Sequence, residues 1–306
     1  MTTESRSLFG ILKDSFKSFG EDDCPTMAAA LSYYTVFSLP PLLVLLLTLL
    51  GAVLDPRDIQ GTIEAQMRDA MGPAGAEQIR TILANADRPG SGGLVAAALS
   101  IVALLLGATG VFGQLQAALN KAWEVAPDPE KGGIKSMLLK RMFGVGMVLG
   151  LAFILLVSLV VSAMLSAFGE QIAGFLPEGL SAPVLEGLNF AASLAVIALL
   201  FGAIFKVMPD ARIAWSDVRV GALVTALLFV AGKFALGLYL GRSNPGEAFG
   251  AAGALALMLV WIYYSSMIVL LGAEFTQVWA EHRGRGIVPE KGAVRVVRET
   301  RRLGEA

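Results

Sequence analysis

The sequence contains very few of the residues that most proteins use for metal or redox chemistry. It has one cysteine, Cys24, and one histidine, His282, among 306 residues. A single cysteine cannot form an internal disulfide, and these two residues cannot supply a cysteine-rich or histidine-rich metal site. We therefore expect no metal ion and no cofactor.

Charged side chains are also scarce, at 16% of the chain, whereas 55% of the residues are hydrophobic. Soluble proteins have a much more polar composition. The first 26 residues lack the short apolar core and the small-residue cleavage site of a secretory signal. The sequence therefore predicts an integral membrane protein whose first span acts as the insertion signal.

Six apolar stretches are long enough to cross the hydrocarbon core of a bilayer, which requires about 20 residues. They cover approximately residues 27–53, 94–119, 142–168, 188–208, 218–240 and 248–276. These stretches predict an all-α, multi-pass protein with one membrane domain over residues 1–280. Because six is an even number, both termini are expected on the same side of the membrane.

Lysine and arginine are distributed unevenly between the segments that connect these spans. Eighteen lie in the two terminal tails, between spans two and three, and between spans four and five, whereas five lie in the remaining connections. Cytoplasmic segments are enriched in both residue types. The distribution therefore predicts that both termini are cytoplasmic.

Three segments outside the predicted spans have recognisable patterns. Residues 6–19 have apolar residues at helical spacing, which predicts an amphipathic helix on the cytoplasmic membrane surface or a cap packed on the helix bundle. Residues 55–92 have the same spacing on both sides of Gly72 and Pro73, which predicts two short helices over the outer ends of the spans. Residues 281–306 are rich in arginine and glycine, which indicates a disordered cytoplasmic anchor rather than a nucleic-acid-binding segment.

Pro40 and Pro41 lie inside the first predicted span. Neither residue has an amide hydrogen, so the carbonyl groups of Val36 and Phe37 lose their helical partners. In hydrocarbon, a neighbouring helix, a hydroxyl group or water must satisfy such carbonyls. The two prolines therefore predict a break or kink in this helix, which has a purely structural role or marks a binding site beside it.

Lys233 lies inside the fifth predicted span. At 1.5 Å per residue it is about 24 Å from Asp217, in the outer half of the membrane. A charge at this depth needs a partner or water. Lys233 is expected to form an ion pair with Glu247, which follows the short turn after this span, or to extend its ammonium group to the outer surface.

A second group of polar residues is expected at the cytoplasmic ends of the spans. It consists of Asp22, Asp23, Tyr33, Tyr34, Gln116, Asn120, Glu274 and Gln277. These side chains either join neighbouring helices by hydrogen bonds or line a vestibule that receives a polar headgroup. The second interpretation suits an amphipathic substrate whose apolar part contacts the leucine-rich spans.

Pairs of glycines four residues apart, such as Gly237 and Gly241, favour close helix packing in a bundle or a dimer. The sequence has no glycine-rich phosphate-binding loop and no ATP-binding domain. Any transport is therefore expected to be passive, ion-coupled or driven by a partner protein.

Four blocks of the sequence resemble the YihY/BrkB family of bacterial inner-membrane proteins. They are AAALSYYTVFSLPPLLVLLL (28–47), GVFGQLQAALNKAWEV (110–125), WSDVRVGALVTALLFVAGKFALGLYL (215–240) and GAAGALALMLVWIYYSSMIVLLGAEF (250–275). The resemblance covers approximately residues 20–280 and implies a six-span protein of the inner membrane. It also implies a relation to proteins once labelled ribonuclease BN, to a member linked with serum resistance, and to members connected genetically with lipid or lipid A export.

The ribonuclease label does not fit the residues of this chain. Nuclease chemistry requires clustered carboxylates with metal ions, or a histidine or lysine acid–base pair, together with a basic groove for the nucleic acid. His282 is the only histidine, and the segments outside the predicted spans are short. We therefore expect no enzyme activity and no nucleic-acid partner.

Two functions remain open. One is a transporter or flippase-like protein for lipids or other amphipathic envelope molecules. Its predicted substrate-binding residues are Lys233, Glu247, Asp23, Tyr33, Tyr34, Gln116, Asn120 and Glu274. The other is a non-transporting scaffold that binds envelope proteins or a second copy of itself. Membrane lipids are expected partners in both cases.

Overall fold

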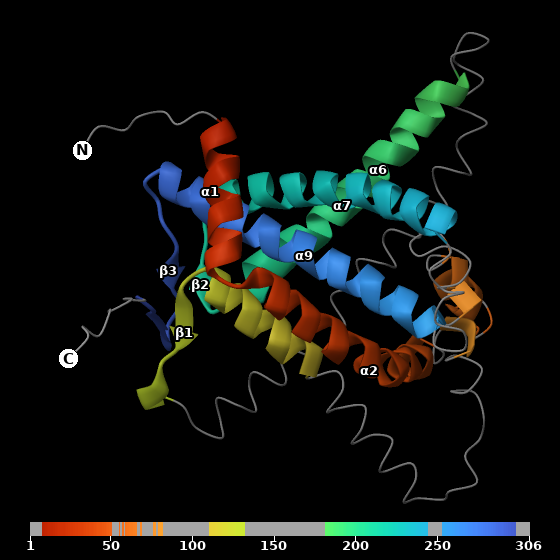
Figure 1. Ribbon diagram of the computed structural model, residues 1–306, viewed down its shortest axis with the longest axis horizontal. Helices are drawn as coiled ribbons and strands as arrows, with labels where there is room; N and C mark the ends of the chain where they lie inside the picture. Colours follow the sequence, from red (N-terminus) through yellow and green to blue (C-terminus); the bar gives the residue numbers. More distant parts are fainter. Residues whose placement is uncertain are drawn as a thin grey trace, which may run out of the picture.

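The computed structural model describes residues 8–50, 55, 57, 59–65, 68, 76–77, 79–81, 110–131, 181–243 and 253–297. This part of the chain is mostly helical (Figure 1). Its helices are α1 (Leu8–Glu21), α2 (Cys24–Leu50), α6 (Ser181–Val207), α7 (Trp215–Ser243) and α9 (Gly253–His282), together with a helical segment at residues 110–122 and a 3₁₀ turn, η1 (Pro129–Lys131).

Three of these helices contain the candidate membrane spans found in the described part of the chain. The spans are Pro183–Val207 in α6, Trp215–Leu238 in α7 and Leu255–His282 in α9. The last three predicted spans are thus confirmed as long apolar helices, although their ends differ from the predicted ones by several residues. The third predicted span and most of the second lie outside the described residues, so the total of six stays a prediction.

α2 continues through Pro40 and Pro41 as a single helix, so the structure contradicts a complete break at this point. The Ser38 hydroxyl donates a hydrogen bond of 3.0 Å to the carbonyl group of Thr35, in the turn before the prolines. This bond does not reach the carbonyl groups of Val36 or Phe37, so a partner for these two carbonyls stays a prediction. A bend of α2 at this point stays a prediction.

α7 and α9 pack closely through two glycines and two threonines. Thr276 of α9 contacts Gly221 of α7, and Thr225 of α7 contacts Gly272 of α9, so closely that a β-carbon on either glycine would overlap the threonine hydroxyl. The hydroxyls of Thr225 and Thr276 donate hydrogen bonds to the glycine carbonyls of their own helices, at 2.6 and 2.7 Å. This reciprocal contact fixes the register of the two antiparallel helices without leaving a hydroxyl unsatisfied.

The largest cluster of buried apolar side chains joins the 110–122 segment to α2, α6, α7 and α9. At its centre, the rings of Trp123 and Phe205 meet edge to face, with 5.9 Å between their centroids. The indole N–H of Trp123 donates a 2.9 Å hydrogen bond to the carbonyl group of Ala273. This packing holds the 110–122 segment against α6 and α9, next to the polar site described below.

In the part of the chain that the structure describes, four short strands form two antiparallel pairs, each of which joins a connection between helices to the segment after α9. β1 (Val125–Pro127) pairs with β4 (Ala293–Arg295), and β2 (Ala211–Arg212) pairs with β3 (Val288–Pro289). The expectation of an all-α protein is therefore incomplete, and the expectation of disorder over residues 281–306 is wrong for its described part. The tail is ordered because its backbone finds hydrogen-bonding partners in two connections that are distant in sequence.

α1, the strands, the start of α7 and the end of α9 gather at one end of the long helices, on the left of Figure 1. These are the segments that the lysine and arginine distribution places on a common side. Their shared location agrees with that grouping, and the identity of the cytoplasmic side stays a prediction.

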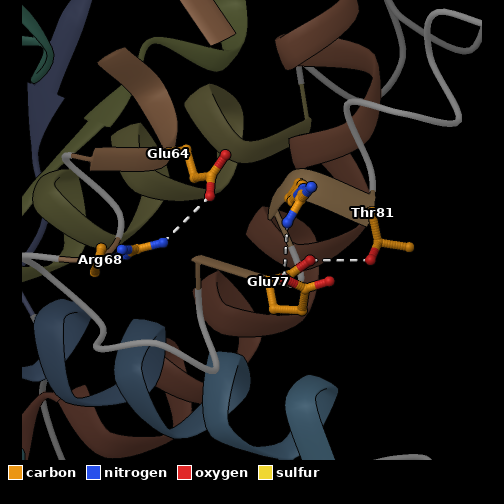
Figure 2. A network of polar contacts seen from close by, with 5 residues as sticks. Glu64, Arg68, Glu77 and Thr81 are labelled. Atoms are coloured by element: carbon orange, nitrogen blue, oxygen red, sulfur yellow. Dashed lines mark hydrogen bonds and ion pairs between the residues drawn. The ribbon is translucent and has the colours of Figure 1, made fainter. Parts of the chain in front are cut away.

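The described residues of the 55–92 connection contact the middle of α2 and the first turns of α9. Ile79 and Met258 are buried there, and Val36, Leu39, Ile63 and Ile262 pack around them. Figure 2 shows the polar side of this connection, where Arg68 contacts Glu64 at 3.3 Å and the Thr81 hydroxyl donates to the Glu77 carbonyl at 2.9 Å. Ile63 and Ile79 thus pack against the long helices, and two helices over the outer ends stay a prediction. The exposed ion pairs of this connection add little stability.

Candidate functional site

A pocket of about 390 Å³ lies beside the end of the 110–122 segment. Its described lining residues are Gly113, Gln116, Ala117, Asn120, Lys121, Glu124, Val125, Ala126, Pro127, Asp210 and Val296. The lining combines one helical face, strand β1, the α6–α7 connection and the C-terminal segment. Its volume is at the lower end of the range for small-molecule sites.

Asp210 is the centre of the hydrogen-bond network at this pocket. The Asn120 side-chain amide donates to one carboxylate oxygen at 2.9 Å, and the Gln116 amide donates to the other at 3.3 Å. The backbone N–H of Asp210 in turn donates to the Asn120 side-chain oxygen at 2.8 Å, and the Asp210 carbonyl accepts from the N–H of Glu290 at 2.9 Å. Gln116 and Asn120 reach the same carboxylate because residues four apart share a helix face.

Charged residues of both signs are among those that line the pocket, although most of its surface is apolar. Glu124 contacts Arg295 at 3.3 Å, and Arg295 also lies 3.9 Å from Glu281. Lys121 is half-buried and forms no ion pair with another described residue. Lys121 lines the same pocket as Asp210, and its positive charge also acts on the buried Cys24 thiol.

A second buried polar contact joins the start of α2 to α9. The Cys24 thiol donates to Oε1 of Glu274 at 3.4 Å, and both residues are fully buried. Within the described structure, Oε2 of Glu274 and Oε1 of Gln277 accept no hydrogen bond. Burial raises the pKa of the Cys24 thiol, which precedes the predicted first span, and the negative charges of Glu274 and Asp22 raise it further. Cys24 is therefore a neutral donor rather than a reactive thiolate.

The structure brings together only part of the polar group that the sequence places at the cytoplasmic ends of the spans. Gln116 and Asn120 share the pocket with Asp210, whereas Glu274 contacts Cys24. These hydrogen bonds join different segments of the chain, whereas a vestibule that receives a headgroup stays a prediction. A role in substrate binding stays a prediction for each of them.

Asp23, Tyr33 and Tyr34 have other surroundings. Asp23 has a left-handed backbone, with φ of 56°, and its carboxylate accepts a 2.9 Å hydrogen bond from the Thr26 hydroxyl at the start of α2. Tyr33 and Tyr34 are largely exposed on α2, and the Tyr33 ring lies 4.8 Å from that of Phe37. None of the three lines the pocket around Asp210.

Lys233 is half-buried on α7 and forms no ion pair within the regions that the structure describes. Glu247, its predicted partner, lies outside those regions. Both the proposed ion pair and the alternative, an ammonium group that extends to the surface, stay predictions.

Several important polar residues were not identified from the sequence. Asp210 is one, and the Asp217–Arg285 pair is another. Arg285 donates to both carboxylate oxygens of Asp217, at 3.0 and 2.7 Å, and the Asp217 side chain is only 1% exposed. Asp217 has a weak local signal, because an acidic residue in the first turn of a helix is stabilised by the helix dipole. No local pattern identifies Arg285 as its partner.

Comparison with known proteins gives a consistent match over most of the chain. The model of a family described as virulence factor BrkB matches residues 15–295. A UPF0761 membrane protein of Pseudoalteromonas atlantica is 29% identical over 262 residues, which are 84% of this chain and 81% of the relative. Another, from Alkalilimnicola ehrlichii, is 30% identical over 273 residues, which are 86% of this chain and 57% of the relative.

A more distant relative has a different kind of name. A protein of Bacillus subtilis named as ribonuclease-like, YfkH, is 23% identical over 271 residues, which are 86% of this chain and 92% of the relative. No solved structure matches the chain significantly.

Proposed function

Because this chain belongs to the BrkB family of membrane proteins, we propose that it is a transporter or flippase-like protein for lipids or other amphipathic molecules of the cell envelope. The proposal places it in the bacterial inner membrane with both termini in the cytoplasm. The observation that carries it is the charged pocket around Asp210, at one end of a set of apolar, membrane-length helices.

An amphipathic molecule needs two different environments, and this arrangement supplies both. Lys121 and Asp210 offer charges and hydrogen bonds to a polar headgroup. α6, α7 and α9 leave large apolar side chains exposed along their length, including Leu199, Leu227 and Phe234. We propose that the pocket holds the polar headgroup. The exposed apolar surfaces of α6, α7 and α9 would then contact the acyl chains.

The proposal includes no chemical reaction. Both Asp210 oxygens already accept amide hydrogen bonds, so this carboxylate is held in place as a binding group rather than as a free base. The described lining residues include no histidine, serine, threonine or cysteine that could act as a nucleophile. We therefore propose a binding and transport role rather than ribonuclease activity, and an RNA-cleavage assay on the purified protein tests that choice directly.

Transport can be measured with purified protein in liposomes that contain a phospholipid with a fluorescent headgroup. A membrane-impermeant reductant destroys only the fluorophores in the outer leaflet, so faster loss of the remaining signal reports lipid movement between leaflets. Lys121→Gln should lower this rate by roughly 10- to 150-fold, because a charge-assisted hydrogen bond contributes roughly 1.5–3 kcal/mol.

Lys291→Gln is the matched control, because it also removes one positive charge at the same end of the molecule. Its transport rate should equal that of the unmodified protein. A rate no higher than that of protein-free liposomes, for all variants, would contradict a lipid-transport function for the protein alone.

A second candidate function is a scaffold for envelope proteins or for a second copy of the chain. The ordered pairing of β1 with β4 and of β2 with β3 favours it. The two candidates differ in their tolerance of substitutions in the spans. A transporter should lose function in Lys233→Leu while it remains folded, whereas a scaffold should keep its partners. Co-purification of partners with this variant separates the two functions.

A further inference from the structure

α1 has an unusual position relative to the long helices. In Figure 1 it runs across the ends of α7 and α9 rather than along them. Because α7 and α9 have the length and composition of membrane spans, a helix that crosses their ends has its axis close to the plane of the membrane surface.

One face of α1 is packed against the protein. Ile11 and Ser15 are 5% and 1% exposed, and Ile11 belongs to a buried cluster with Phe275 and Val278 of α9. The Ser15 hydroxyl donates to the carbonyl group of Ile11 at 2.8 Å, so this buried polar group is satisfied within the helix. This face therefore attaches α1 to α9.

A second face of α1 is apolar but exposed. Its side chains are Leu8, Phe9, Leu12 and Phe16, which are 67%, 76%, 43% and 61% exposed. Leu8, Leu12 and Phe16 follow one another at intervals of four residues and form one continuous stripe next to the packed face. Single exposed apolar side chains are common on protein surfaces. Four large ones next to each other on a 14-residue helix form a contiguous apolar patch.

The third face of α1 is charged, with Lys13 and Lys17 next to the apolar stripe and with Glu21 and Asp14 beyond them. At 100° per residue, Lys13 and Lys17 lie beside the apolar stripe, on the side away from Ile11. Both are exposed, and Lys17 has only a weak ion pair of 3.6 Å with exposed Glu21. Long lysine stems can cover apolar surface while their ammonium groups reach a polar layer above it.

We infer that α1 binds the membrane surface, with Leu8, Phe9, Leu12 and Phe16 among the upper acyl chains and with Lys13 and Lys17 at the phosphates of anionic phospholipids. Each face of α1 then has its own environment. The packed face contacts α9, the apolar face contacts acyl chains, and the lysines contact lipid headgroups. The two sequence-based interpretations of this segment, a membrane-surface helix and a bundle cap, are thus combined in one element. The inference does not depend on the proposed transport function.

The position of α1 can be tested in the full chain with a fluorescent label. Phe16→Cys and Glu21→Cys are each made in a Cys24→Ser background, labelled with an environment-sensitive dye and reconstituted in vesicles. A label at position 16 should lose about half of its emission to lipids brominated in the upper acyl chain, since interfacial helices insert about 5–10 Å deep. The label at position 21 should instead be quenched by aqueous iodide.

The lysines are tested by vesicle composition. Quenching of the position 16 label by brominated lipid should be stronger in vesicles with one quarter phosphatidylglycerol than in pure phosphatidylcholine. The double substitution Lys13→Gln and Lys17→Gln should remove this difference in quenching. Each lysine is expected to raise the ratio of membrane-bound to unbound α1 about fivefold in the anionic vesicles. The Lys291→Gln variant should preserve it.

Three results would overturn the inference. In the first, iodide quenches position 16 as strongly as position 21. In the second, position 16 is quenched equally in both vesicle types, and the lysine substitutions change nothing. In the third, position 16 is shielded from both quenchers and Phe16→Cys forms disulfide-linked dimers, which would show that a second copy of the chain covers the apolar stripe.

Discussion

At the scale of single residues, the protein differs from a simple apolar bundle in how it satisfies its buried polar groups. Asp210 accepts hydrogen bonds from two side-chain amides, and Asp217 accepts two from Arg285. Glu274 has a partner at only one carboxylate oxygen in the described structure. A buried polar group without a hydrogen-bonding partner costs roughly 1–3 kcal/mol of stability. The partners of these groups therefore determine how much each one contributes to stability.

Cys24 provides a direct test of this residue-level description. The thiol is fully buried, and its pKa is raised above the ordinary value of 9.0. A raised pKa keeps the folded thiol protonated at pH 9, where about half of the unfolded thiols are thiolates. Maleimide or iodoacetamide should therefore label the native protein very slowly between pH 7 and 9, and rapidly after denaturation in SDS.

Mass spectrometry gives the labelled fraction over time. A Phe16→Cys variant is the matched control, because Phe16 is exposed and its replacement should react in the native state. Rapid native labelling of Cys24 itself would contradict the buried contact with Glu274.

The Asp217–Arg285 pair predicts unequal effects from its two halves. Arg285→Ala leaves a carboxylate that is only 1% exposed without its partner, and should destabilise the protein by about 2–4 kcal/mol. Asp217→Asn keeps the shape and removes the charge, so it should cost less. Thermal or SDS-induced unfolding of the purified variants measures the difference.

Arg295→Ala is the control, because its ion pairs with Glu124 and Glu281 involve exposed side chains. Its effect should stay below about 1 kcal/mol. If Arg285→Ala and Arg295→Ala lowered the free energy of unfolding equally, the burial of Asp217 would not strengthen its ion pair with Arg285.

At the scale of secondary-structure elements, the decisive feature is the close contact of α7 with α9. The sequence analysis singled out Gly237, yet a β-carbon at this position would meet nothing within 4 Å. The glycines that the packing requires include Gly221 and Gly272, each opposite a threonine of the other helix, and Gly232 of α7, opposite Tyr264 of α9. Glycine spacing indicates that helices can approach closely, but the crossing point decides which glycines are used.

Gly221→Ala and Gly237→Ala therefore form a matched pair on one helix. The first introduces a methyl group into the Thr276 side chain and should destabilise the protein by about 1–3 kcal/mol. The second adds a methyl group in open space, where alanine is the better helix former by up to about 1 kcal/mol, so its effect should be neutral or stabilising. Unfolding midpoints in detergent measure both, and equal effects would refute the close contact.

At the scale of the whole molecule, the structure has two distinct ends. One end holds α1, both strand pairs and the Asp210 pocket, and the other holds the described residues of the 55–92 connection. The first end contains the segments with most of the lysines and arginines. The positive-inside tendency therefore predicts that this end, with its pocket, faces the cytoplasm.

Fusions of reporter enzymes test this orientation. Alkaline phosphatase, which is active only outside the cytoplasm, should be inactive when fused after residue 297 and active when inserted near residue 85. Green fluorescent protein should show the reverse pattern. Active phosphatase at residue 297 would invert the predicted topology and place the pocket on the outer face.

The sequence by itself determined the membrane character of the chain, the approximate positions of α6, α7 and α9, and the grouping of the described connecting segments. These properties depend on local composition and on the roughly 20 residues needed to span hydrocarbon, so they can be inferred without knowledge of tertiary contacts. The amphipathic patterns of α1 and of the 55–92 connection were recognisable for the same reason.

Tertiary structure alone decided which polar residues meet. Gln116 and Asn120 were identified by their spacing, but Asp210, their common partner, lies in a connection about 90 residues away. The C-terminal segment has the composition of a disordered tail, and it is ordered because Arg285 reaches Asp217 and its strands pair with β1 and β2. Hydrogen bonds and ion pairs between distant segments leave no periodic signal in the sequence, since their energy depends on distances that only the folded chain sets.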